Sequence, residues 1–271
     1  LGVLLALLLE FLDDTIKVPD DVEQRLRVPL LGIIPKLGKQ SPQEAFVDPR
    51  SAFAEAYRSV RTALQFSTDQ GVPKVLLVTS PVPAEGKSTT ALTLARNFAQ
   101  LGKRVLLIEG DLRNPSLHKA LGVRADQGLS SLLAGSAGPG DVILDTADAN
   151  LQVILAGPLP PNPAELLSGS RLVSLLAVAS ERYDQVIIDG PPVLGIADAP
   201  ILSNAASGTL LVVQAGKTKI KTAQTALKRL LAARARVIGA LLTQYDAKAT
   251  GYGYDYESYY AYGATPRIGR G

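Results

Sequence analysis

The turn at residues 80–89, with the sequence SPVPAEGKST, constrains the fold of this chain more than any other stretch. It follows an apolar run at 75–78 and leads into a stretch of helix-forming residues at 89–99. A strand, a tight turn with Gly-Lys-Ser and a helix are the layout of a phosphate-binding loop, in which backbone N–H groups at the helix start face an anion. The first glycine of the usual pattern is missing, because Pro81 stands there. The stretch predicts a nucleotide site, and a solvated surface turn is the alternative.

Two side chains of this turn have chemistry that suits a bound nucleotide. Lys87 would add a positive charge next to the β- and γ-phosphates, and the Ser88 hydroxyl would offer a ligand for Mg²⁺. The residues that we expect to contact the nucleotide are Ala84, Glu85, Gly86, Lys87, Ser88 and Thr89.

Carboxylates follow two further apolar runs. The run at 105–108 ends on Glu109 and Asp111, and the run at 186–188 ends on Asp189. A magnesium–nucleotide site needs carboxylates near the metal and its waters, because Mg²⁺ keeps several waters and takes few protein ligands. Each motif alone is weak, since Asp is a common residue after a strand, and a plain strand-end cap is the alternative for Asp189. Together with Lys87 and Ser88, the carboxylates predict a magnesium–nucleotide site.

Apolar runs and helical stretches alternate from residue 74 onward. Runs rich in Leu, Ile and Val predict strands at 74–79, 104–109, 151–156, 184–189, 208–214 and 237–242. Helices are predicted at 51–68, 88–101, 128–134, 164–168, 170–180 and 219–233. Strands that are apolar throughout and separated by helices indicate an α/β fold, with a parallel sheet covered by helices on both faces. Ligands bind such sheets at the carboxyl ends of the strands, where all three motifs lie.

The two ends of the chain differ from this central part. Residues 1–12 are apolar nearly all round, which favours the end of a truncated transmembrane helix over a buried amphipathic helix. Residues 13–50 are mixed and predict a juxtamembrane connector with a small docking element, while residues 51–246 form the P-loop domain. Residues 247–271 contain six tyrosines but no Leu, Ile or Val before Ile268, so we expect a flexible, tyrosine-rich tail.

Composition excludes several other classes of function. The 271 residues carry a net charge of +3 with scattered basic residues, which gives little support for nucleic-acid binding. The sequence contains no cysteine, which excludes structural disulfides and thiolate catalysis. It also contains no methionine, so we expect a fragment of a longer protein.

Taken together, these motifs resemble the bacterial tyrosine kinases of capsular and extracellular polysaccharide biosynthesis and export, which share a deviant P-loop fold with partition and septum-positioning ATPases. Residues 80–89 match the Walker A motif of that family, 109–113 its Walker A′ motif and 187–192 its Walker B motif. The segment PNPAELL at 161–167 is also typical of the family. The tail matches its phosphoacceptor cluster, here Tyr252, Tyr254, Tyr256, Tyr259, Tyr260 and Tyr262.

The resemblance implies roles for the residues of the site. Lys87 and the amides of the loop would hold the phosphates of ATP. The implied ligands of Mg²⁺, directly or through water, are Ser88, Asp111 and Asp189. Glu109, or Asp111, would accept the proton of the tyrosine hydroxyl, so that Lys87, Glu109, Asp111 and Asp189 are the implied catalytic residues. Arg113 would touch phosphate or pair with Asp111.

Two departures from the family pattern affect these expectations. The Walker A′ motif usually begins with Asp, whereas this chain has Glu109, whose carboxylate lies one methylene farther from the backbone. A glycine is frequent at the position of Ala84, and we expect an ordinary φ there because the residue is alanine.

The resemblance also implies an assembly. The helix predicted at 51–68 carries Glu55, Arg58 and Arg61 on one flank, and these match the family's Glu-x-x-Arg-x-x-Arg subunit-interface motif of a closed homo-oligomeric ring. A set of salt bridges within the helix is the alternative that the residues alone would favour. The implied partners are a periplasmic chain-length domain of the same protein or a transmembrane adaptor, together with a phosphotyrosine phosphatase. The implied location is the cytoplasmic face of the bacterial inner membrane.

The function implied by the resemblance is an autokinase that phosphorylates its own tyrosine tail between subunits and regulates polysaccharide polymerisation and export. One alternative is a nucleotide-switched positioning ATPase. Such an ATPase would carry an extra lysine early in the loop, where Pro81 and Val82 stand, and would have no reason to end in clustered tyrosines. The other alternative is a catalytically weak ring scaffold, which Glu109 leaves open.

Overall fold

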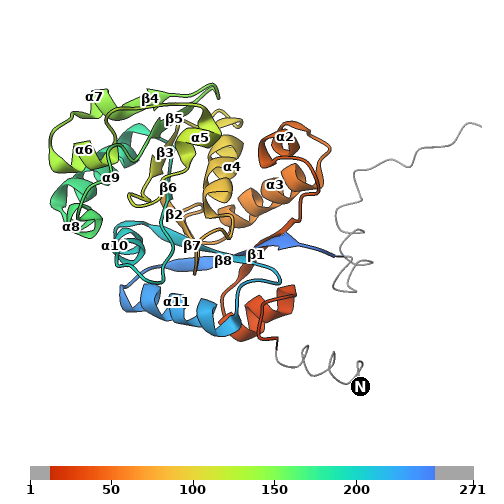
Figure 1. Cartoon of the computed structure of the whole chain (residues 1–271). Helices are drawn as coiled ribbons and strands as arrows, with labels where there is room; N and C mark the ends of the chain where they lie inside the picture. The colour runs from red at the N-terminus through yellow and green to blue at the C-terminus, as the bar shows by residue number, and fades with distance from the viewer. Residues whose placement is uncertain (1–12, 248–271) are drawn as a thin grey trace, which may run out of the picture.

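The computed structural model describes residues 13–247, whose strands form an eight-stranded sheet (Figure 1). The segments 1–12 and 248–271, with the predicted membrane-helix end and tyrosine cluster, lie outside the described residues. The strands are β1 (Leu30–Pro35), β2 (Val75–Thr79), β3 (Val105–Glu109), β4 (Ile143–Asp145), β5 (Leu151–Ile154), β6 (Gln185–Asp189), β7 (Gly208–Gln214) and β8 (Val237–Tyr245). Their order is β1-β8-β7-β2-β6-β3-β5-β4, and each neighbouring pair is parallel except β4 with β5.

Helices cover both faces of this sheet, as the sequence predicts (Figure 1). They are the π-helix η1 (Asp21–Leu26) and the α-helices α2 (Pro42–Val47), α3 (Ala52–Gln65), α4 (Lys87–Ala99), α5 (Leu117–Leu121), α6 (Leu129–Ala134), α7 (Pro139–Val142), α8 (Pro163–Ser168), α9 (Ser170–Arg182), α10 (Asp198–Ala205) and α11 (Ile220–Ala232). On one face, α3 and α4 pack against Leu76 and Val78 of β2. On the other face, α9 packs on the side of Leu77, while α11 and η1 cover β7 and β8.

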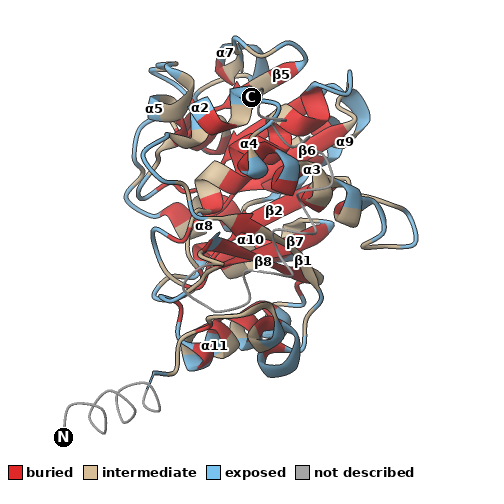
Figure 2. Cartoon of the chain, turned by 90° about the vertical axis from the view of Figure 1, so that its right-hand side faces the viewer, coloured by how far each residue is buried: buried red, intermediate tan, exposed pale blue. Residues whose placement is uncertain are grey.

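Burial explains why the central strands could be predicted from sequence. All five residues of β2, β3 and β6 are buried, because helices lie on both faces of these strands. Strands of this kind read as continuous apolar runs and not as alternating ones. Figure 2 shows the buried residues gathered in the sheet and on the inner sides of the helices.

Residues 13–50 belong to the same fold, which corrects the expectation of a connector. β1 pairs in parallel with β8 and forms one edge of the sheet. Ile16, Val22 and Leu26 are buried in the cluster that includes the inner side of α11. β1 was not predicted, because glycine and proline interrupt its apolar pattern. The glycine has a packing reason, since a Cβ at Gly32 would lie 2.4 Å from Cγ2 of Val60 on α3.

The predicted strands and helices are all present, with ends that differ from the prediction by a few residues. The elements that were not predicted are β1, β4, η1, α2, α5, α7 and α10, each of at most eight residues. No helix within residues 13–247 combines the length and the apolar character needed to cross a lipid bilayer.

The three sequence motifs meet in the middle of the sheet. β2, β6 and β3 are neighbours, and their register places Asp189 beside both Val78 and Glu109. Because these strands are parallel, the loops that follow them leave the sheet at the same edge. The start of α4 lies directly after the loop that follows β2, so the lysine of Gly-Lys-Ser faces the two acidic loops.

Candidate active site

The loop between β2 and α4 contains two residues in the left-handed region. Gly86 has φ +94° and Ala84 has φ +62°. The expectation of an ordinary φ at Ala84 is therefore wrong, and this alanine costs about 1–2 kcal/mol relative to a right-handed conformation. Lys217 supports it, because its Nζ donates to the carbonyl oxygen of Ala84 at 3.1 Å. No side chain among the described residues caps the start of α4, so its first N–H groups remain available to an anion.

Lys87, the first residue of α4, reaches the carboxylates that follow β3 and end β6. Its Nζ lies 3.0 Å from Oδ2 of Asp111 and 3.7 Å from Oδ1 of Asp189. The Oγ of Ser88 lies 3.4 Å from the same Nζ. Burial alone would lower the pKa of Lys87, but the negative charges of Asp189 and Asp111 outweigh burial and raise it. Lys87 therefore stays protonated beside the loop.

Asp189 is fully buried, and neither of its carboxylate oxygens has a hydrogen-bond partner among the described residues. Burial raises the pKa of Asp189 to about 6, although the positive charge of Lys87 opposes this shift. A buried carboxylate without hydrogen bonds is unfavourable unless a ligand completes its surroundings. The site therefore fits a magnesium–nucleotide complex, with Ser88, Asp111 and Asp189 near the ion and Lys87 near the phosphates. Residues 13–247 contain no cluster of three or more His, Cys, Asp or Glu side chains placed to bind a metal by themselves.

Asp111 is oriented by the loop that follows β3. Its Oδ1 accepts hydrogen bonds from the backbone N–H groups of Asn114 at 3.0 Å and Arg113 at 3.3 Å. Its Oδ2 accepts from Nζ of Lys87 at 3.0 Å. The carboxylate is thus fixed by two amides on one side, while its other oxygen points at the lysine of the loop.

The carboxylate of Glu109 is bound by backbone donors from two loops. Its side chain is buried, and Oε1 accepts from the N–H groups of Ser116 and Leu117 at 2.6 Å each. Oε2 accepts from the N–H group of Ala156 at 3.0 Å. Both oxygens are therefore used to join the loop after β3 to the end of β5. Three backbone donors already bind the carboxylate of Glu109, and this favours the alternative, Asp111, as the acceptor of the tyrosine proton.

The side chain of Glu85 accepts hydrogen bonds from other residues of the chain and is not available to a nucleotide. It is 1% exposed, and its carboxylate accepts from the hydroxyl of Thr218 and from the Val82 N–H group, the latter at 3.2 Å. Burial raises the pKa of Glu85 to about 7, against the opposing effect of these two donors. Only the backbone of Glu85 is left to contact a ligand. Thr218 was not predicted as a site residue, because it lies 133 positions from Glu85 and no local pattern connects the two.

Arg113 pairs with Asp198 and not with Asp111. Its Nε lies 2.8 Å from Oδ2, and its Nη2 3.1 Å from Oδ1, of this aspartate at the start of α10. Asp198 is fully buried. It was not predicted, because Asp198 lies 85 positions from its partner and no local pattern connects the two.

The flank of α3 combines an internal ion pair with a buried donor. Oε2 of Glu55 lies 2.6 Å from Nη2 of Arg58, which also donates to the carbonyl oxygen of Pro49 at 2.8 Å. These two residues therefore form the salt bridge within the helix that was the alternative to an interface. Arg61 differs, because its buried Nε has no hydrogen-bond partner among the described residues. Its Nη1 donates to the carbonyl oxygen of Asn97 at 3.4 Å.

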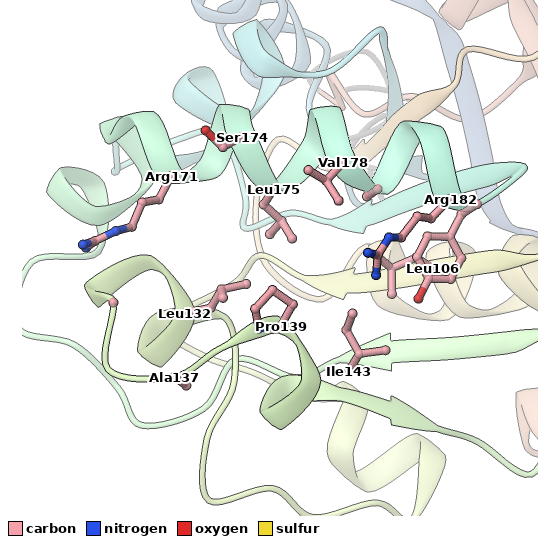
Figure 3. Close-up of a pocket in the computed structure, with 13 residues that line it drawn as sticks. Leu106, Leu132, Ala137, Pro139, Ile143, Arg171, Ser174, Leu175, Val178 and Arg182 are labelled. Carbon is pink, nitrogen blue, oxygen red and sulfur yellow. The ribbon is translucent and has the colours of Figure 1, made fainter.

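A hollow of about 320 Å³ lies beside the loop and is lined in part by Ser88, Ser116 and Lys119. A second hollow, of about 350 Å³, lies between α9 and the segment from α6 to β4 (Figure 3). Its lining is mainly apolar, with Arg171 and Arg182 of α9 at its border, and it includes none of the predicted catalytic residues. The first hollow also lacks the four predicted catalytic residues, but it adjoins the phosphate loop through Ser88 and Thr89.

The chain is similar to known proteins over most of its length, and residues 84–238 match the family described as AAA domain. It is 41% identical to the tyrosine-protein kinase YwqD of Bacillus subtilis over 211 residues, which are 78% of this chain and 89% of that protein. It is 40% identical to the tyrosine-protein kinase Wzc of Salmonella typhimurium over 224 residues, which are 83% of this chain but 31% of that protein. The solved kinase domain of the Escherichia coli tyrosine kinase ETK matches with a TM-score of 0.79 at 31% identity, over 85% of this chain and 95% of that domain.

Glu109→Gln tests whether Glu109 supports the structure or acts as a base. We expect the free energy of unfolding to fall by about 1–3 kcal/mol, because the new NH₂ group must face a backbone N–H group that now donates to the carboxylate. Urea denaturation measures this change, with the exposed Glu181→Gln as the matched control. Unchanged stability together with turnover lowered by roughly 10²–10⁴-fold would instead identify Glu109 as the base.

Glu85 should make the stability of the chain depend on pH. Its pKa is raised from 4.5 to about 7, so the folded state binds the proton more tightly than the unfolded state does. The resulting stabilisation is fully present below about pH 4.5 and is lost as the pH rises through about 7. Glu85→Gln has no carboxyl proton to lose at this position. Between about pH 5 and about pH 8, its free energy of unfolding should therefore rise by about 2 kcal/mol relative to that of the wild type.

Urea denaturation of the wild type and of Glu85→Gln at the two pH values measures that gain. Glu181→Gln serves as the control, since Glu181 is exposed and its substitution should give the same difference from the wild type at both pH values. A difference between Glu85→Gln and the wild type that does not change with pH would contradict the raised pKa.

Proposed function

The chain belongs to the bacterial tyrosine-protein kinases, and on this premise we propose that it transfers phosphate from ATP to tyrosines in the C-terminal segment of a neighbouring subunit. The main support is the meeting of Lys87 with the buried carboxylates of Asp111 and Asp189 at the start of α4. ATP binding follows from the P-loop family to which the chain belongs. A requirement for Mg²⁺ is part of the proposal.

Phosphoryl transfer depends mainly on positioning and on neutralisation of charge. We assign Lys87 and the free N–H groups at the start of α4 to the phosphates of ATP. Ser88, Asp111 and Asp189 are assigned to Mg²⁺, which when bound neutralises charge on the phosphate oxygens. The remaining contacts with the nucleotide are assigned to the backbone of Ala84, Glu85, Gly86 and Thr89.

Asp111 is the carboxylate that we assign to the tyrosine hydroxyl. Glu109 is occupied by three backbone donors, whereas Oδ2 of Asp111 accepts only from Lys87 among the described residues. If Lys87 turns to the phosphates, this oxygen becomes available to another donor. A tyrosine hydroxyl has a pKa of about 10, so its attack is assisted by a nearby acceptor for the proton.

The acceptors that we propose are six tyrosines outside the described residues, namely Tyr252, Tyr254, Tyr256, Tyr259, Tyr260 and Tyr262. The 24 residues at 248–271 can extend over roughly 80 Å, which is far enough to reach the site of a neighbouring subunit. The hollow lined by Ser88 and Ser116 is the entry that we assign to the tyrosine side chain.

The flank of α3 is the subunit interface that we propose for a closed ring. Glu55 and Arg58 are exposed enough to meet a neighbour, and the buried Nε of Arg61 lacks an acceptor that a second subunit could supply. Because a ring needs two different surfaces to meet head to tail, this flank is only one half of the interface.

Control of polysaccharide polymerisation and export, at the cytoplasmic face of the bacterial inner membrane, is the cellular role that we propose. It is supported by the family and by the apolar sequence at 1–12, directly before the described part of the chain. The partners that this role requires are a periplasmic domain of the same protein or a transmembrane adaptor. A phosphotyrosine phosphatase would reverse the modification.

Lys87→Met tests the assignment of the phosphate site. After incubation of the full chain with ATP and Mg²⁺, intact mass should show several added phosphates on the wild type and none on the variant, because the cation beside the phosphates is lost. Lys103→Met, at an exposed lysine, should be phosphorylated like the wild type. Circular dichroism must show that Lys87→Met is folded, since two buried carboxylates lose their cation. Phosphate on a folded variant that is free of other kinases would contradict the assignment.

Arg58→Ala/Arg61→Ala tests the ring and its control by phosphorylation. Each phosphate adds about −1.5 to −2 charges, so modified tails of adjacent subunits should repel one another. Light scattering should therefore show assembly of the unmodified chain, but not of the double variant or of the fully phosphorylated chain. Arg124→Ala, at an exposed arginine outside α3, should assemble normally. Assembly that persists in the double variant would contradict the interface, and assembly that persists after phosphorylation would contradict the switch.

A further inference from the structure

The two acidic loops of the site separate as they leave the sheet. β3 and β6 are paired up to Glu109 and Asp189, and a last backbone hydrogen bond of 2.9 Å joins the Gly110 N–H group to the Asp189 carbonyl oxygen. Beyond this point, residues 110–116 lead to α5, whereas residues 190–197 lead to α10. Asp111 and Asp189 lie where this separation begins. Beyond this point, backbone pairing between β3 and β6 no longer fixes the distance between the two loops.

The ion pair between Arg113 and Asp198 joins the loops again. Asp198 is the first residue of α10 and binds the guanidinium with both oxygens, at 2.8 Å and 3.1 Å. The arginine side chain is 44% exposed, while the aspartate side chain is fully buried. An exposed arginine alone has many rotamers, so a bidentate contact with a buried carboxylate is what gives Arg113 one position.

The same arginine orients Asp111 through its backbone. The N–H groups of Arg113 and Asn114 donate to Oδ1 of Asp111, which leaves Oδ2 for Lys87. A shift of Arg113 would therefore move the donors that fix this carboxylate. Asp198 has no contact with Lys87 or with the carboxylates of the site in the described hydrogen bonds and ion pairs, so any effect it has must pass through Arg113.

The loop that carries Asp198 is itself tied to the phosphate loop. The N–H groups of Val193 and Leu194 donate to the carbonyl oxygens of Ser80 at 2.8 Å and Pro81 at 3.1 Å. The position of Asp198 is therefore fixed relative to the phosphate loop and to Asp189. Because Arg113 binds Asp198, the ion pair also fixes the loop that carries Asp111.

We propose that Asp198 is a positioning residue, which through Arg113 fixes the spacing of Asp111 and Asp189 and so sets the affinity of the site for Mg²⁺ in the presence of nucleotide. This inference rests on the proposed function, since it takes Asp111 and Asp189 as the carboxylates nearest the ion. Outer partners of metal ligands act in this way, and their loss commonly weakens metal affinity by about 10–100-fold.

The test is the binding of a fluorescent ADP analogue to the full chain, measured at increasing Mg²⁺ and in EDTA. Asp198→Asn should raise the half-saturating Mg²⁺ concentration by about tenfold or more, while the affinity in EDTA stays close to that of the wild type. Arg113→Gln should have the same effect, and Asp198→Asn/Arg113→Gln should be no worse than either single variant, because both changes remove one interaction. The double variant leaves no buried charge unpaired, so it remains informative if a single variant fails to fold.

Asp184→Asn is the matched control. Asp184 pairs with Arg104 at 3.3 Å, and these residues precede β6 and β3, so this ion pair joins the same two strands at their opposite ends. Its loss should leave the Mg²⁺ dependence unchanged.

Three outcomes separate the possibilities. A wild-type Mg²⁺ dependence in the double variant would overturn the inference. An equal loss of affinity with and without Mg²⁺ would also overturn it, because it would show a general structural role. A wild-type chain that binds the ADP analogue equally with and without Mg²⁺ would contradict the Mg²⁺ requirement in the proposed function itself.

Discussion

Two buried carboxylates share one lysine at the carboxyl ends of β3 and β6, and the chemistry of the site follows from this imbalance of charge. Lys87 lies 3.0 Å from Asp111 and 3.7 Å from Asp189. Charges interact strongly where water is excluded, and an excess of negative charge there is costly. The pKa of Asp189, raised to about 6 by burial, shows one response of the protein, which is to take up a proton. In the proposed function, a divalent cation would balance the same charge at neutral pH, where the carboxylate has lost its proton.

Three further buried carboxylates keep the surrounding loops in place. Glu109 accepts from amides at both Ser116 and Ala156, so it joins two loops at the edge of the sheet. Glu85 accepts from Thr218, which joins the phosphate loop to the segment after β7. Asp198 binds Arg113. A site that works by positioning needs a rigid surrounding shell, and long-range hydrogen bonds to buried charges are stronger than neutral ones. The acidic residues that join loops are thus distinct from Asp111 and Asp189, which we propose to bind the ligand.

Features that depend on a local sequence pattern could be predicted, whereas features that depend on residues far apart in the sequence could not. β2, β3 and β6 could be predicted because they are buried on both faces, and the phosphate loop because its chemistry lies in one short stretch. β1 could not be predicted, because its edge position and its close contact at Gly32 with α3 break the apolar pattern. For Glu109 the location at the strand end was correct, but its hydrogen bonds could not be predicted, because their donors lie at positions 116, 117 and 156. The left-handed conformation of Ala84 is likewise set by its surroundings, including Lys217, and not by its own preference.

Under the proposed function, the shared lysine would also couple the binding of nucleotide to the binding of its metal. A nucleotide alone must draw Lys87 from Asp111 and Asp189, which leaves two buried negative charges without a cation next to the charged phosphates. A divalent ion alone would bring two further positive charges beside Lys87, whose raised pKa keeps it protonated, so that three positive charges would face two carboxylates. If both were bound, Lys87 would face the phosphates and Asp111 and Asp189 would hold the ion, so every charge would keep a partner. Under the proposed function each ligand would therefore lower the cost of binding the other, and by linkage the effect would be equal in both directions.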